Sequence, residues 1–403
     1  IHDPSNRPCF FRWKAAYHVT GVVNMTILTV DIDGTILPPK DYSNLTIIRN
    51  NVALSILDQW LVALRDADII SAFGYSTSNS LDDAHEKIKN GGLPKPDFIG
   101  SASGTELHIR TSTGTWTPHA LNEKYLREIN FPIEAISNAV DNFLLRQDTA
   151  SNSWWTIQGY EKDPTEIYVL HARGYRINPT QGAFTREQLD SLKTKIVPAL
   201  ITHINTILKK STRSSFEHPI QVAVNYFDIS EKGIEIVIIP QERERKTDVL
   251  QFALRNNNNG EFAEHPWKKN GIIFAGNTYN DLNILTDPKI SFILVGNADE
   301  SFKQTVETEQ QKHTKRAPVY ISRTPLALGI IEGVLACLDT DAQATALKTL
   351  LQIRSFNETY QDLITSGIIP DRYRDLATEN GLISLENHLK NPGFWLSQKN
   401  QAR

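Results

Sequence analysis

The chain has 403 residues, a formal net charge of -4 at pH 7, 40% hydrophobic residues and 22% charged residues. This composition is typical of a folded globular protein, and the length predicts more than one domain. The mild charge favours neither nucleic acid nor an anionic membrane as a partner. We find no apolar run long enough to span a membrane.

The two cysteines, Cys9 and Cys337, lie far apart in the sequence. This argues against a disulfide framework or a zinc site and predicts a reducing, cytoplasmic compartment. The chain begins with Ile1, and its single methionine, Met25, directly precedes the first predicted strand. We therefore expect residues 1–24 to be a leader of uncertain origin, without a signal peptide because charged residues interrupt its apolar stretches.

Strand-like and helix-like segments alternate from residue 26 onward. The predicted elements are a strand over 27–32, a helix over 50–67, a strand over 68–73, a helix over 80–90, and strands over 97–101 and 106–110. An alternation of strands and helices is typical of a parallel sheet with helices on its faces.

The pattern changes between about residues 115 and 240. Here the sequence predicts a helix over 131–145, a strand over 165–171, a long helix over 185–209 with an apolar stripe, and strands over 220–228 and 234–239 joined by a short turn. A block of helices and strands that ends in a hairpin indicates a separate α+β unit, which we place at 115–240.

The alternating pattern then resumes. It predicts a helix over 246–256, a strand over 271–275, a short helix over 279–285, strands over 290–295 and 319–321, and a helix over 326–338. The predicted fold class is therefore α/β, with a Rossmann-like parallel core at 25–114 and 241–339 that carries the α+β unit as an insertion. A helical C-terminal extension follows at 340–403, with helices over 341–355, 358–366 and 382–389. Packing on the core and self-association explain its apolar positions equally well.

The most informative motif is Asp31-Ile-Asp33-Gly-Thr35, which directly follows the first predicted strand. In open α/β sheets, ligand-binding and active sites lie at the carboxyl ends of the strands. An aspartate there can attack phosphorus and form an acyl phosphate, and a second carboxylate can act as general acid and then base. Magnesium would offset the repulsion between these carboxylates and a phosphate.

Two further segments would complete a phosphate site around these aspartates. The first is Tyr75-Ser-Thr-Ser-Asn-Ser80, after the strand over 68–73, where a hydroxyl can hold a phosphate oxygen and the following helix start offers backbone N–H groups. Lys246 opens the helix after the insertion, where an ammonium group can pair with the first aspartate and neutralise a phosphoryl group. Arg243 and Arg245 are competing candidates for this cation.

The fourth segment, Gly276–Asp281, follows the strand over 271–275. It contains Asn277, Asn280 and Asp281, whose amide and carboxylate oxygens suit magnesium, a cation that prefers hard oxygen ligands. An ordinary asparagine-rich turn is the alternative reading of this loop.

The order of the four segments resembles the haloacid dehalogenase superfamily of phosphohydrolases, and the insertion lies where the sugar-phosphatase branch of that superfamily carries an α/β cap. Within the branch the chain is most similar to sucrose-6-phosphate phosphatases. Three further segments carry this similarity, namely Ser103–Glu106, Ile238–Gln241 and Val295–Ala298. The resemblance covers about residues 25–338.

The resemblance implies a magnesium-dependent phosphatase that hydrolyses a sugar phosphate monoester through an aspartyl-phosphate, while the cap selects the sugar. The implied roles are nucleophile for Asp31, acid/base for Asp33, phosphate binding for Thr77, Ser76 and Asn280, phosphate stabilisation for Lys246, and metal binding for Asp31, Asp33 (through its backbone carbonyl), Asn277 and Asp281.

Two segments depart from the family pattern. Asn277 stands where the family has an aspartate, and Thr77-Ser-Asn79 stands where it has Thr-Gly-Arg. A neutral ligand binds magnesium less strongly, so these departures predict weaker metal binding and slower or shifted activity.

Four alternative functions stay open at this point. Two are phosphatases of the mannosyl-phosphoglycerate or trehalose-phosphate type, the third is a phosphosugar mutase, and the fourth is a non-catalytic phosphosugar-binding protein. In each case a phosphorylated sugar is the expected small-molecule partner, nucleic acid and membranes are not expected partners, and the oligomeric state stays open.

Overall fold

The computed structural model describes residues 26–39, 42–129, 131–148, 154–159, 173–211, 221–241, 245–256, 271–312 and 318–353. The predicted leader at 1–24, the predicted strand over 165–171, and the predicted helices over 358–366 and 382–389 lie outside these residues. In the described residues, no helix combines the length and apolarity needed to cross a membrane. The predicted cytoplasmic location stays a prediction.

The first of two sheets has eight strands in the order β12-β11-β10-β1-β2-β3-β4-β5. The strands of this sheet are β1 (Thr26–Val30), β2 (Ile70–Ser76), β3 (Phe98–Ser101), β4 (Glu106–Arg110), β5 (Trp116–Pro118), β10 (Ile272–Gly276), β11 (Ile290–Leu294) and β12 (Val319–Ile321). All neighbours from β12 to β3 are parallel, whereas β4 and β5 are antiparallel. The predicted α/β class with a parallel core is confirmed.

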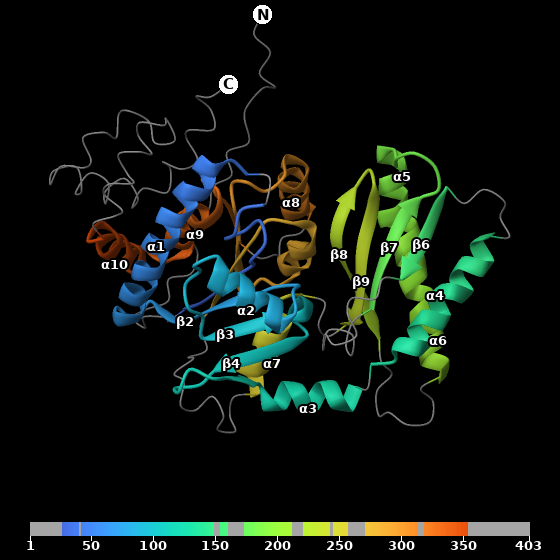
Figure 1. Ribbon diagram of the computed structural model, residues 1–403, viewed down its shortest axis with the longest axis horizontal. Coiled ribbons are helices and arrows are strands. Elements are labelled where there is room, and N and C mark those ends of the chain that lie inside the picture. The colour runs from blue at the N-terminus through green and yellow to red at the C-terminus, as the bar shows by residue number, and fades with distance from the viewer. Residues whose placement is uncertain are drawn as a thin grey trace, which may run out of the picture.

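Helices cover both faces of this sheet, as Figure 1 shows. They are α1 (Asn44–Asp66), α2 (Leu81–Asn90), α3 (Ala120–Ile129), α7 (Asp248–Asn256), α8 (Glu300–Lys312), α9 (Leu326–Cys337) and α10 (Thr340–Leu351). Successive residues of a strand point to opposite faces. Leu28 accordingly packs in the apolar cluster that contains residues of α1 and α9, whereas Ile27 packs in the cluster that contains residues of α7 and α8.

The start of the C-terminal extension packs on this core. The indole nitrogen of Trp60 on α1 donates to the carbonyl of Ala346 on α10 at 2.8 Å. Leu347 and Leu350 are buried in the same cluster as α1 and α9. In residues 340–353, packing on the core therefore accounts for the apolar positions.

The second sheet has four antiparallel strands in the order β6-β7-β9-β8. Its elements are β6 (Trp155–Gly159), β7 (Arg173–Pro179), β8 (Val222–Ser230) and β9 (Gly233–Pro240), with α4 (Ile133–Asp148), α5 (Arg186–Ser191), a π-helical turn at Leu192–Ile196, and α6 (Val197–Ser211). In Figure 1 these helices lie on the face of the second sheet that points away from the first sheet. Strand β8 contacts the 3-10 helix Tyr279–Thr286, which follows β10.

The structure corrects several predicted elements. Helix α1 begins at Asn44, six residues before its predicted start, because the hydroxyl of Ser43 caps it by accepting from the backbone of Thr46. Strand β2 begins at Ile70, because Asp68 has a left-handed φ of 57° that makes a turn. The elements that were not predicted are β5, α3, β6, β7, α8 and the short 3-10 helix Ala102–Gly104.

Strand β5 belongs to the first sheet although it lies beyond residue 114, where the predicted cap begins. The exact domain limits stay a prediction. The two sheets give the natural division, with the inserted unit built on the antiparallel sheet and its helices.

Candidate active site

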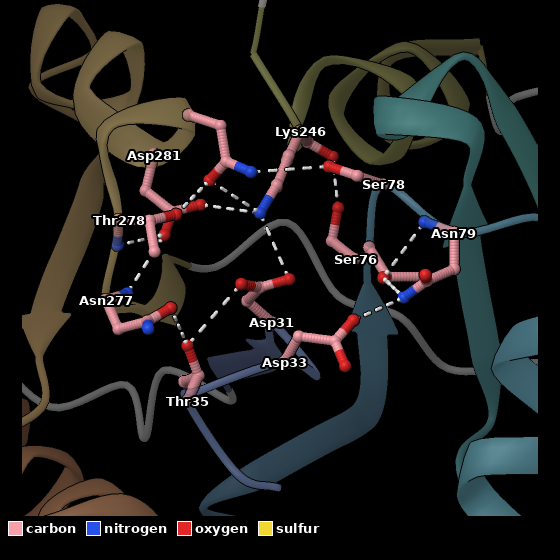
Figure 2. A network of polar contacts seen from close by, with 12 residues as sticks. Asp31, Asp33, Thr35, Ser76, Ser78, Asn79, Lys246, Asn277, Thr278 and Asp281 are labelled. Carbon is pink, nitrogen blue, oxygen red and sulfur yellow. Dashed lines mark hydrogen bonds and ion pairs between the residues drawn. The ribbon is translucent and has the colours of Figure 1, made fainter. Parts of the chain in front are cut away.

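The predicted segments meet at one edge of the first sheet. Strand β1 lies between β10 and β2, and all three run parallel, so their carboxyl ends lie side by side. The chain leaves β1 into Asp31, leaves β2 into Thr77 and leaves β10 into Asn277. Figure 2 shows Asp31 and Asn277 with the side chain of Lys246. Lys246 lies two residues before α7 and does not open it, contrary to the sequence prediction.

The ammonium group of Lys246 joins two carboxylates in the protein interior. Its Nζ lies 3.0 Å from Oδ1 of Asp31 and 2.9 Å from Oδ1 of Asp281, and it donates to Oδ1 of Asn280 at 3.0 Å. The side chain of Lys246 is only 1% exposed. The other oxygen of Asp281 accepts from the backbone N–H groups of Asn277 and Thr278. Asp281 thus connects the lysine to the loop after β10.

The backbone around Lys246 is also held in place. The hydroxyl of Ser76 donates to the carbonyl of Lys246. Gly104 packs against the same carbonyl with a φ of +78°, and a Cβ at this position would lie 2.6 Å from the carbonyl oxygen. Only glycine combines that backbone conformation with that contact.

The neighbouring arginine turns away from this cluster. Nε of Arg245 donates to Asp248 at 2.7 Å, and its guanidinium also pairs with Asp287 at 3.5 Å. Of the two candidates for the phosphate-binding cation, Lys246 therefore lies in the cluster and Arg245 does not. Arg243 lies outside the described residues.

The charges in this cluster do not balance. Burial raises the pKa of Asp31 to about 7, with the ammonium of Lys246 opposing the rise and the carboxylates of Asp281 and Asp33 adding to it. Burial by itself would lower the pKa of Lys246, but Asp281 and Asp31 outweigh it and raise that pKa. One buried ammonium thus faces two buried carboxylates, and an added cation would offset the remaining negative charge.

Oxygens of two predicted metal ligands meet beside Thr35. The hydroxyl of Thr35 lies 2.8 Å from Oδ1 of Asn277 and 3.5 Å from Oδ2 of Asp31. Among the residues that the structure describes, no group of three or more His, Cys, Asp or Glu side chains forms a metal site. The donor set is therefore mixed, with carboxylate and amide oxygens beside uncompensated negative charge, and this set fits a hard cation such as magnesium.

The close approach of Asn277 depends on Gly34. Gly34 has a φ of +71°, and a Cβ there would lie 2.3 Å from Nδ2 of Asn277. The carbonyl of Gly34 accepts from Nδ2 of Asn297 at 2.6 Å, and Oδ1 of Asn297 accepts from the backbone of Leu326. The segment Val295–Ala298 thus fixes the turn that follows Asp31.

The structure distinguishes the hydroxyls of Ser76 and Thr77. Ser76 uses its hydroxyl on the carbonyl of Lys246. Thr77 is fully buried, and its Oγ1 accepts from both the backbone N–H and the Nδ2 of Asn79, at 3.2 and 2.7 Å. Because both contacts use the Thr77 oxygen as an acceptor, its proton is left for donation to an incoming anion.

Asn280 faces the cluster from the loop after β10. Its Oδ1 accepts from Lys246 and from the hydroxyl of Thr278, while its Nδ2 donates to the hydroxyl of Ser78 at 3.4 Å. Asn280 therefore joins the loops after β2 and β10.

The carboxylate of Asp33 points away from Asp31, toward Asn79, as Figure 2 shows. Its Oδ2 accepts from Nδ2 of Asn79 at 2.7 Å, and its two oxygens lie 2.9 and 2.8 Å from Nζ of Lys87. Lys87 was not predicted as a site residue. Its position held a signal, because Lys87 follows the buried Ala84 by three residues and so lies on the same helix face.

This fold, with this cluster at the carboxyl ends of its central strands, defines a phosphoric monoester hydrolase of the haloacid dehalogenase superfamily. The model of the family described as sucrose-6F-phosphate phosphohydrolase matches residues 24–165 and 231–336, more than half of the chain. The chain belongs to this family. No curated protein sequence gives a significant match.

Several solved structures are similar to this chain. The sucrose-phosphatase of Synechocystis sp. PCC6803, solved with sucrose and phosphate, is 17% identical with a TM-score of 0.45, and the match covers 78% of this chain and 98% of that one. The haloacid dehalogenase-like hydrolase yhjK of Bacillus subtilis is 15% identical with a TM-score of 0.45, over 79% and 93% of the two chains. An IMP-nucleotidase mutant of Plasmodium falciparum with bound IMP is 11% identical with a TM-score of 0.37, over 82% and 69%.

Proposed function

We propose that this protein is a magnesium-dependent phosphatase that hydrolyses a sugar phosphate monoester through an aspartyl-phosphate at Asp31. Sucrose 6-phosphate is the first substrate to test, because the chain belongs to the sucrose-6F-phosphate phosphohydrolase family. The observation that carries the proposal is the contact of Lys246 with both Asp31 and Asp281 at the carboxyl ends of neighbouring strands.

In the first step, a carboxylate oxygen of Asp31 attacks phosphorus, and the bond between phosphorus and the sugar oxygen breaks. The acid form of Asp33 gives a proton to the departing sugar oxygen. The hydroxyl of Thr77 and the ammonium of Lys246 donate to the phosphoryl oxygens and stabilise their charge. Asn280 orients the ammonium by accepting one of its hydrogens.

In the second step, Asp33 takes a proton from a water molecule, whose oxygen attacks the phosphorus of the aspartyl-phosphate. The bond between phosphorus and the Asp31 oxygen breaks, inorganic phosphate leaves, and both aspartates return to their starting states. Asp33 thus acts first as acid and then as base.

Asp31, the carbonyl of Asp33 and Asn277 are the residues that would hold magnesium. Asp281 was also predicted as a metal ligand, but its oxygens contact Lys246 and the backbone of Asn277 and Thr278, so we assign it the role of adding negative charge and fixing Lys246. When bound, the cation neutralises charge on the carboxylates and the phosphate.

The test is the release of inorganic phosphate from sucrose 6-phosphate, trehalose 6-phosphate and mannosyl-phosphoglycerate at saturating magnesium, with Asp31→Asn as control. We expect release by the wild-type protein from at least one substrate and none by the variant. Wild-type protein that releases no phosphate from any of them contradicts the proposal. Isomerisation of a sugar phosphate without phosphate release would instead identify a mutase.

A further inference from the structure

Asp33 can act as a general acid only if contacts with other residues hold its carboxylate in one orientation. Its side chain is 56% exposed, whereas that of Asp31 is 6% exposed. An exposed aspartate side chain moves readily between rotamers. A general acid must lie within hydrogen-bond reach of the leaving oxygen, so free rotation of Asp33 would lower the fraction of productive complexes.

Lys87 supplies such a support from helix α2. Its Nζ lies 2.9 and 2.8 Å from the two carboxylate oxygens of Asp33, and it also donates to Oδ1 of Asn79 at 2.9 Å. Asn79 in turn donates to Oδ2 of Asp33 at 2.7 Å. The three side chains close a ring of contacts, in which both oxygens of Asp33 are engaged.

The same ring reaches the phosphate-binding hydroxyl. Nδ2 of Asn79 lies 2.7 Å from Oδ2 of Asp33 and 2.7 Å from Oγ1 of Thr77. One amide group therefore connects the carboxylate of Asp33 with the Thr77 hydroxyl that we propose to bind the phosphate. A half-exposed ion pair contributes little to folding stability, so the main effect of these contacts is to orient the Asp33 carboxylate.

We propose that Lys87 is a positioning residue, which fixes the carboxylate of Asp33 beside Thr77 through its contacts with Asp33 and Asn79. The proposal rests on the proposed phosphatase function. Through Asp33, Lys87 acts on both proton transfers, first to the leaving oxygen and then from water, whereas the attack by Asp31 does not use its contacts with Asp33 and Asn79.

The test compares two leaving groups. A sugar alkoxide leaves only when it is protonated, whereas the nitrophenolate of p-nitrophenyl phosphate leaves without a proton. For Lys87→Met we expect kcat/KM on the sugar phosphate to fall about 10- to 100-fold with KM nearly unchanged, and kcat/KM on p-nitrophenyl phosphate to fall less than about threefold. The comparison uses kcat/KM because it reports the first step, in which the leaving group departs, whereas kcat also includes the second step, in which Asp33 activates water for both substrates. Lys87→Arg keeps the charge and the donors, so it should recover most of the activity on the sugar phosphate.

The matched control is Lys89→Met, which removes the same charge from an exposed position on the same helix. Lys89→Met should leave the activity on both substrates unchanged. Thermal unfolding of all variants separates loss of fold from loss of positioning. The proposal is overturned if Lys87→Met keeps full activity on the sugar phosphate, or lowers kcat/KM by the same factor on both substrates. Wild-type protein that is inactive on both substrates overturns the phosphatase proposal together with this one.

Discussion

The ammonium of Lys246 lies 3.0 Å from the carboxylate of Asp31, although about half of the chain separates the two residues. Both side chains are almost completely buried. Their contact therefore joins the first strand of the sheet to the segment that follows the inserted unit, and the protein cannot form it until both parts of the core have folded together.

Lys246→Met removes the charge while it retains most of the side-chain volume. It leaves the carboxylates of Asp31 and Asp281 buried without their ammonium partner. We expect phosphatase activity to be lost and the free energy of unfolding in metal-free buffer to fall by about 3–5 kcal/mol. Urea denaturation with a chelator measures this change, with Lys89→Met as the control. Unchanged stability of Lys246→Met would contradict the charge argument.

The raised pKa of Asp31 predicts a pH dependence of stability in the metal-free protein. Burial raises this pKa from 3.8 to about 7, so between these values the folded state binds more protons than the unfolded state. The stabilising contribution is therefore fully present below pH 3.8 and is lost as the pH rises to about 7. Between pH 3.8 and about 7, the free energy of unfolding of the wild-type protein should fall by up to about 4 kcal/mol relative to that of Asp31→Asn.

The measurement is denaturant unfolding of both proteins in chelator at several pH values between 4 and 8. Plotted against pH, the free energies of unfolding of the two proteins should run parallel above pH 7, because Asp31 is then ionised in both the folded and the unfolded state. Saturating magnesium should reduce the difference, because it favours the ionised carboxylate. Parallel curves over the whole range in chelator would mean that Asp31 titrates normally.

The parallel half of the fold was predictable because its central strands are buried on both faces. Strands β1 and β10 are therefore nearly continuous apolar runs, and each is followed by polar residues. In strands β6 and β7 apolar residues alternate with polar ones, so these strands contain no such run. Helix α8 was missed because Phe302 and Val306 are its only apolar residues.

The meeting of the polar segments was also predictable, since neighbouring parallel strands end at one edge of the sheet. The sequence could not decide which side chain of each segment points inward. The backbone of the loop after β2 assigns Ser76 to the Lys246 carbonyl, and the turn before α7 directs Arg245 to Asp248. Lys87 reaches the site from a helix and belongs to none of the motifs.

Asn277→Asp should strengthen magnesium binding. The substitution places a carboxylate oxygen where Oδ1 of Asn277 now lies 2.8 Å from the hydroxyl of Thr35, close to Asp31. We expect the magnesium concentration for half-maximal activity to fall at least about tenfold, the effect of about 1.4 kcal/mol of added attraction. Without metal, the added negative charge should instead lower the melting temperature.

Asn277→Gln is the control, because it keeps a neutral amide. A magnesium titration of activity and a melting curve in chelator test both expectations on the same samples. If Asn277→Asp leaves the magnesium requirement unchanged, this side chain is not a metal ligand.

Thr77→Val and Ser76→Ala separate the two hydroxyls after β2. Thr77→Val removes the hydroxyl whose proton is left for a phosphate, and a hydrogen bond to a charged group contributes about 1.5–3 kcal/mol. We expect kcat/KM to fall about 10- to 100-fold. Ser76→Ala removes only a bond to the neutral carbonyl of Lys246, so the loss should stay below about tenfold.

Thr77→Ser is the matched control for the first variant, since it retains the hydroxyl and should keep most of the activity. Inhibition by inorganic phosphate gives a second measurement that does not depend on the chemical step. Thr77→Val should weaken this inhibition, whereas Ser76→Ala should change it little, because only the Thr77 hydroxyl is free to donate to the anion. The opposite order would assign phosphate binding to Ser76 and make Thr77 a support for Asn79.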